Sequence, residues 1–405
     1  MINIKNGETT VIVIDSIMGS GKSNLAIKYI QRSQLPVMYV TPYLDEVDRF
    51  VKSIDNMYEP KGEIKSISLK MLINKGCHIA TTHSLFSIMK EDILKKLKEK
   101  KYVLILDEVI EAYQTYPMTK QDYKLLKDKE YIFVDNNLRV YANDDEETKY
   151  IRQELFTSGV FNDFFQCIDN NMVYEYLNTP IVEYPINIFK AFNNIMVLTY
   201  MFRGSTLKPY FEINNINYNV VNLDGNSDII YTGEKFKDLI HIHSPKNSQD
   251  FNAYELSATW YKKHCAYRGK ELAKHTRSFF NYVSKAKQDS CLYTVYKENI
   301  KDVYIKGYVN SYVPMNLRAT NKYSNKMYGA YLVNRFLNPI VKKFIQHKKG
   351  VINEKVYALS EMLQWIWRLR IRNNQDIWLY IPSKRMRGLL QEWLGDRKKS
   401  KKLYS

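Results

Sequence analysis

Short runs of consecutive apolar residues recur through the first 110 residues of the chain, and helical patterns separate them. None of these runs alternates with polar residues, which is typical of parallel strands that are covered on both faces. Strands that alternate with helices in this way predict an α/β domain with a parallel sheet. The predicted strands lie at 9–15, 36–41, 77–81 and 102–107, and the predicted helices at about 22–32, 44–55 and 84–99.

Residues 113–190 show a different pattern, with sparse apolar positions and many Asn, Asp, Lys and Tyr residues. We interpret this stretch as a mainly helical insertion between two strands of the first domain. The apolar run NIMVLT at 194–199 then returns the chain to the sheet.

The α/β pattern resumes after NLDGNSD at 222–228, whose Gly and Asn residues are typical of a linker. Further strands are predicted at 238–243, 290–296 and 376–381, and the helical pattern SKRMRGLLQEWL follows the last of them. A length of 405 residues also favours two domains over one. We therefore predict two domains, 1–225 and 226–405, each with a parallel sheet.

The charge of the chain indicates a class of partner. The formal net charge is +17, and a protein this basic is expected to meet a polyanion. Residues 341–405 hold 16 Lys or Arg against 5 Asp or Glu. A solvated C-terminal face and a surface that contacts phosphates explain this local excess equally well.

Composition also bears on the compartment. No run of 18 or more apolar residues occurs, so we expect no membrane span, and the first ten residues lack the apolar core of a secretory signal. The cysteines are widely spaced and form no C-x-x-C pair, which predicts reduced thiols, no structural zinc and a cytoplasmic protein. They are Cys77, Cys167, Cys265 and Cys291.

The first apolar strand runs directly into SIMGSGKS at 16–23, which has the spacing of a phosphate-binding loop between a strand and a helix. Two glycines lack side chains, so successive backbone N–H groups are able to point at phosphate oxygens. The Lys22 ammonium is placed for the β- and γ-phosphates, and the Ser23 hydroxyl for Mg²⁺. Ser16 stands where Gly or Ala is usual, and it is small enough for the turn. The candidate nucleotide-binding residues are Ser16, Gly19, Ser20, Gly21, Lys22, Ser23 and Asn24.

Two carboxylates, Asp107 and Glu108, end the apolar run YVLILD. Beside a phosphate-binding loop, a carboxylate such as Asp107 orients Mg²⁺ through its water shell. Glu108 is placed to polarise the water that attacks the γ-phosphate, as a general base. The pair alone would equally suit a solvated turn, and it is the preceding loop that makes it a candidate for ATP hydrolysis.

These two motifs together resemble those of the superfamily 2 helicases, the DEAD/DEAH-box group, which have two RecA-like P-loop domains. The pair at 107–108 matches the start of the family's DExx box, although Ile110 stands where His or Asp is common. The resemblance implies that ATP and Mg²⁺ bind in a cleft between the two domains. It also implies that arginines of the second domain complete the site.

The string QWIWRLRIR at 364–372 resembles motif VI, which supplies those arginines in the family. Gln364 and Arg368 match its Q-x-x-x-R pattern. The second arginine usually falls three residues after the first, where this chain has Ile371. Arg370 and Arg372 flank that position, and the sequence does not decide between them.

Other strings resemble the motifs from which the family contacts nucleic-acid phosphates. TPYLDEVDR at 41–49 resembles motif Ia, THSLF at 82–86 the TTxS-type motif, and NLRATN at 316–321 motif V, while LTYMFRGS at 198–205 occupies the place of motif III. Such contacts follow the backbone and carry no sequence information. Each residue also has a structural alternative, such as a helix cap for a threonine. The candidate contacts are Thr41, Arg49, Thr82, His83, Ser84, Arg318, Thr320 and Asn321.

Longer strings in the second half, such as AYLVNRFLNP at 330–339 and YIPSKRMRGLL at 380–390, are similar to helicase-like replication proteins of bacteriophages and prophages. The resemblance implies an ATP-dependent DNA helicase or translocase in phage replication or recombination. Its partners would be single-stranded or forked duplex DNA and replication proteins. The alternative is a nucleic-acid-stimulated ATPase that remodels protein–DNA complexes or loads a partner without unwinding. A DNA-packaging ATPase is disfavoured, because the basic second half lacks the clustered carboxylates of a nuclease.

Overall fold

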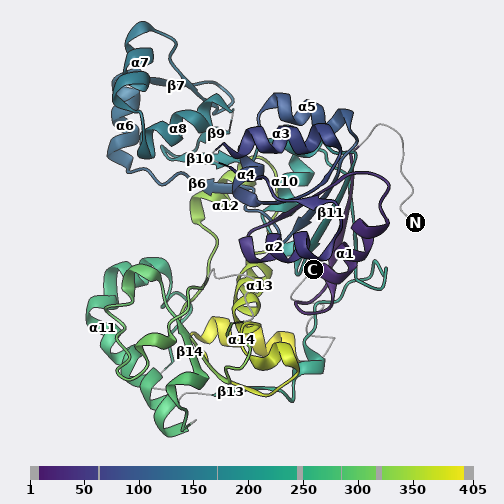
Figure 1. Cartoon of the computed structure of the whole chain (residues 1–405). Helices are drawn as coiled ribbons and strands as arrows, with labels where there is room; N and C mark the ends of the chain where they lie inside the picture. The colour runs from purple at the N-terminus through teal and green to yellow at the C-terminus, as the bar shows by residue number, and fades with distance from the viewer. Residues whose placement is uncertain are drawn as a thin grey trace.

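The structure, a computed structural model, describes residues 9–62, 64–170, 172–243, 250–283, 285–315 and 322–395. The chain forms two parallel sheets with helices around them, and a smaller lobe projects from the first sheet (Figure 1). The predicted α/β class with parallel sheets is confirmed.

Seven parallel strands form the first sheet in the order β12-β1-β11-β5-β2-β4-β3. Its central strands are buried on both faces, as β5 shows: Leu104 and Leu106 enter one core while Val103 and Ile105 enter the other. This arrangement explains the continuous apolar runs of the sequence. The strands are β1 (Thr10–Asp15), β2 (Val37–Thr41), β3 (Met57–Tyr58), β4 (His78–Thr82), β5 (Val103–Asp107), β11 (Asn194–Thr199) and β12 (Tyr218–Val221).

Helices cover both faces of this sheet. On one face, α1 (Lys22–Arg32) and α2 (Leu44–Ser53) contribute Ala26 and Phe50 to the core. The other face is covered by helices that bring Leu69, Leu97 and Tyr210 into a second core. These helices are α3 (Lys65–Lys75), α4 (His83–Ser87), α5 (Glu91–Glu99), α9 (Ile186–Lys190) and α10 (Leu207–Ile213).

The stretch at 113–190, predicted as a mainly helical insertion, contains helices together with two small antiparallel sheets, β6-β10-β9 and β7-β8. Tyr123 and Phe164 belong to a separate hydrophobic core in this lobe. Its strands have only three or four residues, too few to show an alternating pattern. The elements are β6 (Tyr113–Thr115), α6 (Lys120–Asp128), β7 (Ile132–Val134), β8 (Val140–Ala142), α7 (Glu146–Tyr150), the π-helix η1 (Ile151–Leu155), α8 (Gly159–Asp169), β9 (Val173–Glu175) and β10 (Pro180–Glu183).

Four parallel strands form the second sheet in the order β13-β16-β15-β14. On one face, α11 (Ala258–Ser278) brings Trp260 and Cys265 into a shared core, and a π-helical turn, η5 (Phe279–Val283), follows it. On the other, α13 (Glu354–Ile366) and α14 (Lys384–Leu394) contribute Trp365 and Trp393. The strands are β13 (Ile240–His243), β14 (Cys291–Thr294), β15 (Tyr328–Tyr331) and β16 (Ile377–Tyr380).

One helix of the second half packs with the first half. Val341 and Phe344 of α12 (Pro339–His347) belong to a core of the first sheet, and the Phe344 ring lies 5.8 Å from that of Tyr113 in β6. Figure 1 shows α12 beside the lobe and α13 running back toward the second sheet. The division at residue 225 stays a prediction, and the chain crosses between the two sheets more than once.

The predicted strands are all present, with ends that differ by no more than two residues. The predicted helix at 84–99 is two helices, α4 and α5. The sequence pattern missed β12, β15 and α11, because β12 is an edge strand with partly exposed residues and α11 is polar over much of its length. Among the described residues, no helix has the length and apolar character that a membrane span needs.

The close approach of the two halves at Gly204 is testable. Gly204 ends the turn η2 (Phe202–Gly204), and a Cβ built there would lie 2.6 Å from the backbone N of Tyr357 in α13. Gly204→Ala should therefore lower the free energy of unfolding by about 1–3 kcal/mol in urea unfolding. Gly388→Ala in α14 is the control, since nothing lies within 4 Å of a Cβ built there. Equal stability of the two variants would contradict this packing.

Candidate functional site

The loop between β1 and α1 has a backbone conformation that depends on its glycines. Gly19 and Gly21 have φ of +77° and +103°, which residues with a side chain rarely adopt. Gly21 caps the N-terminus of α1, so the helix begins at Lys22. The helix dipole and the first backbone N–H groups of α1 therefore face the loop.

Lys22 places its ammonium inside this loop. Its Nζ donates to the carbonyl oxygens of Ser16 and, at 3.0 Å, of Ile17. Burial lowers the pKa of Lys22, and the negative charges of Glu108 and Asp107 act against that fall. The ammonium thus lies where carboxylates already stabilise its charge.

The two carboxylates at the end of β5 lie opposite the loop. The Tyr39 hydroxyl of β2 donates to Asp107 Oδ2 at 2.6 Å. Burial, and next the charge of Glu108, raise the pKa of Asp107 to about 7. Glu108 has a left-handed backbone, with φ of +65°, and its N–H donates to the Leu198 carbonyl of β11 at 2.9 Å. A non-glycine residue in this conformation stores strain, which is common at functional sites.

A pocket of about 260 Å³ joins these groups to the second half of the chain. The first half contributes the loop, Asp107 and Glu108, and the second half contributes the end of α13 and the residues after it. Among the residues predicted for nucleotide binding and catalysis, the pocket is lined by Gly19, Gly21, Lys22, Ser23, Asn24, Asp107, Glu108, Gln364, Arg368 and Arg372. Segments that are far apart in the sequence therefore form one site.

The structure distinguishes Arg372 from Arg370, between which the sequence did not decide. Arg372 lines the pocket, and its Cγ lies 3.8 Å from a Cβ built on Gly19. Arg370 lies outside the lining, and its Nε donates to the carbonyl oxygen of Asp376. Arg368 is buried, with 5% of its surface exposed. Arg372 thus approaches the loop, and Arg368 lines the same pocket from the second half.

The residues present fit a nucleoside triphosphate with Mg²⁺. Ser23 and Asp107 line the same pocket and offer the oxygen ligands that Mg²⁺ prefers. Two adjacent carboxylates, one of them buried, favour a cation beside them. Lys22 and the two arginines supply the positive charge that phosphates require.

Two other loop residues face away from this pocket. The Ser16 Oγ accepts a hydrogen bond from the Leu223 N–H at 2.9 Å, which explains how a serine fits there. Ser20 lines a separate cavity with Ser16, on the side of residues 222–235.

The predicted nucleic-acid contacts occupy different positions. Thr41 is fully buried, and Arg49 lines the pocket between the two halves, where it forms an ion pair with Glu46 at 2.6 Å. These two positions do not favour a contact with nucleic acid. Thr82, His83 and Ser84 lie at the start of α4, and the Thr82 side chain makes no capping hydrogen bond. Arg318, Thr320 and Asn321 lie outside the described residues.

Sequence reasoning missed Asp15, which lies at the end of β1 directly before the loop. Only 1% of its surface is exposed, and its carboxylate accepts from the N–H groups of Met201 at 2.7 Å and Phe202 at 2.9 Å, and from the Tyr231 hydroxyl. Burial raises the pKa of Asp15, and these hydrogen bonds act against that rise. Met201 has φ of +61°, so the carboxylate fixes a strained turn after β11. The available signal was an acidic residue at the end of a strand that is otherwise apolar.

A comparison with known proteins identifies the family. The SPbeta prophage-derived uncharacterized protein YonV of Bacillus subtilis (strain 168) is 34% identical over 412 residues, which cover 96% of this chain and 99% of that protein. The chain belongs to the YonV family. A family model described as the YonV C-terminal Rossmann-like domain matches residues 234–394, which include the second sheet and α11 to α14.

Solved XPD structures have a fold similar to that of this YonV family member. Xpd4 of S. tokodaii is 11% identical with a TM-score of 0.52, over 98% of this chain and 96% of that one. An apo XPD structure is 13% identical with the same TM-score, over 94% of this chain and 95% of that one. Identities this low show the fold alone. The chain shares the α/β architecture of XPD-type helicases across nearly its whole length.

The hydrogen bonds of the Asp15 carboxylate should contribute to the free energy of unfolding. Tyr231→Phe removes the hydroxyl that donates to a buried carboxylate, so it should lower the free energy of unfolding by about 1–3 kcal/mol. Tyr304→Phe makes the same change at a residue that is 60% exposed and should be neutral. Urea unfolding at neutral pH compares the two, and a loss of equal size in both would contradict the role of Asp15.

Proposed function

We propose that this protein is an ATP-dependent nucleic-acid motor, a helicase or translocase that hydrolyses ATP between two halves of the chain. The observation that carries the proposal is the shared pocket, in which Lys22 and Glu108 of the first half face Arg368 and Arg372 of the second. A split site of this kind couples hydrolysis to movement, because it is complete only when the two halves are close. The fold shared with XPD-type helicases supports the proposal.

Each residue of the pocket has a role in the proposed reaction. The loop from Ser16 to Asn24 binds the phosphates through its backbone N–H groups, and Lys22 neutralises the β- and γ-phosphates. Ser23 and Asp107 would hold Mg²⁺, which would neutralise phosphate charge when bound. Glu108 takes the proton of the attacking water. Arg368 and Arg372 stabilise the negative charge that develops on the transferred phosphoryl group.

We expect ATP hydrolysis to be coupled to movement of the two halves through two sets of contacts. We propose that residues 1–225 and 226–405 act as the two moving domains, with α12 as a contact between them. Asp15 joins β1, the strand before the phosphate-binding loop, to the turn after β11 and to Tyr231 beyond the sheet. Since Gln364 and Arg368 lie at the end of α13, a shift of that helix would move both of them relative to Lys22.

The nucleic acid is expected to be DNA, in single-stranded or forked form. The net charge of +17 supports a polyanionic partner, and a relative described as prophage-derived supports a role in phage or prophage replication or recombination. Thr82, Ser84 and the segment with Arg318, Thr320 and Asn321 are the proposed backbone contacts. The protein would act in the cytoplasm, with replication proteins as further partners.

A second candidate is an ATPase that remodels protein–DNA complexes without unwinding. It is favoured by Ile110, which is buried in the core where the family's box often has a polar residue. The lobe at 113–190 also has its own core and could hold a partner. Strand displacement on a forked duplex separates the two functions, since only a helicase releases the displaced strand.

Nucleotide hydrolysis is the first test. The wild type should hydrolyse ATP with Mg²⁺, faster with nucleic acid, and the stimulation should fall steeply with salt. Lys22→Ala and Glu108→Gln should each lower turnover by about 10²-fold or more. The assay compares single-stranded DNA, duplex DNA and RNA over a salt series. Wild-type turnover in either variant would refute the site, and a rate unaffected by any nucleic acid would refute both candidate functions.

The two arginines that flank Ile371 give a matched pair for a second test. Arg372→Ala should lower kcat by about 10³-fold, because Arg372 faces the loop. Arg370→Ala should change kcat far less, because its guanidinium is bonded to the Asp376 carbonyl. Steady-state kinetics with saturating nucleic acid measures both. A larger loss of kcat in Arg370→Ala would reverse the assignment.

A further inference from the structure

A second and much larger cleft, of about 1240 Å³, lies between the two halves of the chain. One wall comes from β6 and the residues before it, and another from residues 252–260 at the start of α11. The segment at 335–342, which leads into α12, and the first turn of α13 close the cleft. None of the residues that line the nucleotide pocket lines this cleft.

An exposed aromatic stack lies on this cleft. The rings of Tyr254 and Phe336 are stacked, with centroids 6.2 Å apart and planes at 19°. The Arg385 guanidinium lies over the Phe336 ring at 4.1 Å. Tyr254 is 79% exposed, so most of its ring is open to a ligand. A flat ring on a fixed support is suited to stack with a nucleobase, whatever the base.

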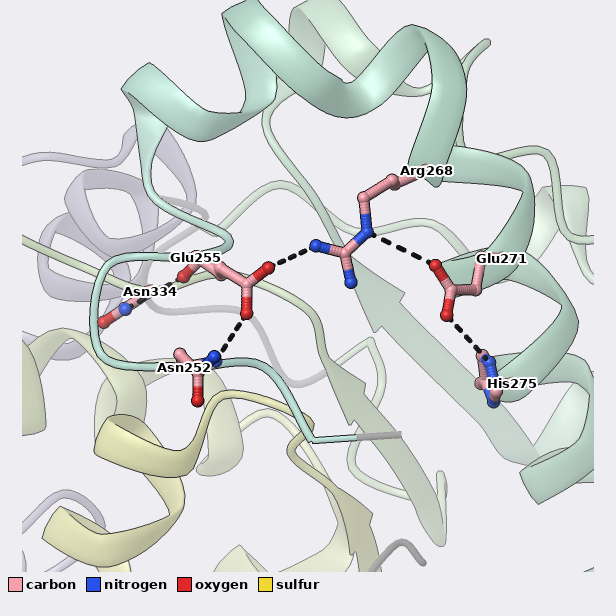
Figure 2. Close-up of polar contacts among 6 residues, drawn as sticks. All are labelled: Asn252, Glu255, Arg268, Glu271, His275 and Asn334. Carbon is pink, nitrogen blue, oxygen red and sulfur yellow. Dashed lines mark hydrogen bonds and ion pairs between the residues drawn. The ribbon is translucent and has the colours of Figure 1, made fainter. Parts of the chain in front are cut away.

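The loop that carries Tyr254 is held from several sides (Figure 2). The Glu255 carboxylate accepts from the Asn252 N–H at 2.7 Å and from Arg268. The buried Asn334 donates to the carbonyl oxygens of Ala253 at 2.8 Å and Glu255 at 3.0 Å. Since these bonds fix the residues on both sides of Tyr254, a ligand that stacks on it would need little further ordering of the loop.

The charges around the cleft suit phosphates next to the stack. The N-termini of α11 and α12, capped by Ser257 and Asn338, both line it, and such ends attract anions. Lys263 lines it too and is exposed. Two carboxylates of the cleft have cationic partners, Glu255 in Arg268 and Glu354 in Lys342 at 3.0 Å. The third, Glu111, accepts a hydrogen bond from Thr206 at 3.2 Å and lies on the wall next to β6.

The cleft is also connected with the nucleotide pocket. Glu354 and Tyr357 at the start of α13 line the cleft, and Gln364 at its end lines the pocket. On the other side, Glu108 lines the pocket, and Glu111 lines the cleft three residues later. A ligand in the cleft would therefore touch both chain segments that carry the hydrolytic residues.

We propose that this cleft binds single-stranded nucleic acid, with one base stacked on Tyr254 and the adjacent phosphates near Lys263 and the two helix N-termini. The inference rests on the proposed function, and it adds a base-stacking site in the cleft to the backbone contacts proposed above. Through α13 and residues 108–111, the bound strand would stimulate ATP hydrolysis.

Fluorescence anisotropy with a labelled oligothymidylate tests the proposal. Tyr254→Ala should weaken binding about tenfold, and Tyr254→Phe should bind like the wild type because it keeps the ring. Tyr267→Ala is the matched control, since Tyr267 lies on α11, is 78% exposed and does not line the cleft. Equal affinities of Tyr254→Ala and Tyr267→Ala would overturn the proposal.

Photocrosslinking gives a readout that does not depend on a variant. An oligonucleotide with 5-iodouracil should crosslink to the peptide that contains Tyr254. Crosslinks confined to other segments would overturn the proposal and would leave the cleft to a protein partner.

If the wild type hydrolyses ATP but binds no oligonucleotide, this inference fails while the nucleotide site stands. If it binds the oligonucleotide at Tyr254 but hydrolyses no ATP, the proposed motor fails and the binding site stands.

Discussion

The parallel register of the seven-stranded sheet is the constraint on which the candidate site depends. Asp15 at the end of β1 lies opposite Thr199 in β11, and Leu198 lies opposite Asp107 in β5. Because these strands run in one direction, the phosphate-binding loop and the carboxylate pair leave the sheet at the same edge. A slip of one residue would turn the Asp107 side chain to the opposite face. The chemistry of the site is thus a consequence of strand pairing.

The second half of the chain contributes to the candidate site by packing against the first half. Gly204 admits α13 against the turn after β11, so the helix that carries Gln364 is seated on the first half. The hydrogen bond between Tyr231 and Asp15 ties the chain beyond the first sheet to the strand that precedes the loop. Buried carboxylates are costly in isolation, and here positive side chains and backbone N–H groups face them. The contacts that join the two halves of the chain therefore also assemble the pocket.

Much of the fold could be predicted because its signals are local. The central strands of the first sheet are contiguous apolar runs, because each is buried between two cores. The lobe at 113–190 could not be predicted in detail, since β7 and β8 are three-residue strands stabilised only by pairing with each other. Likewise, nothing in a run of polar residues shows that α11 continues for 21 residues, because its burial is decided by the second sheet.

The sequence by itself determined the chemical groups of the candidate site, because a phosphate-binding loop, a carboxylate pair and a Q-x-x-x-R pattern are each contiguous in the chain. Only the tertiary structure decided which groups meet. It turned Arg372 toward Gly19 and Arg370 toward Asp376, and it placed Arg49 in the pocket between the two halves. It also joined Asp15 to an amide 186 residues later. The physical reason is that these contacts depend on how distant segments pack, and a side chain's direction there is set by neighbours that no local pattern contains.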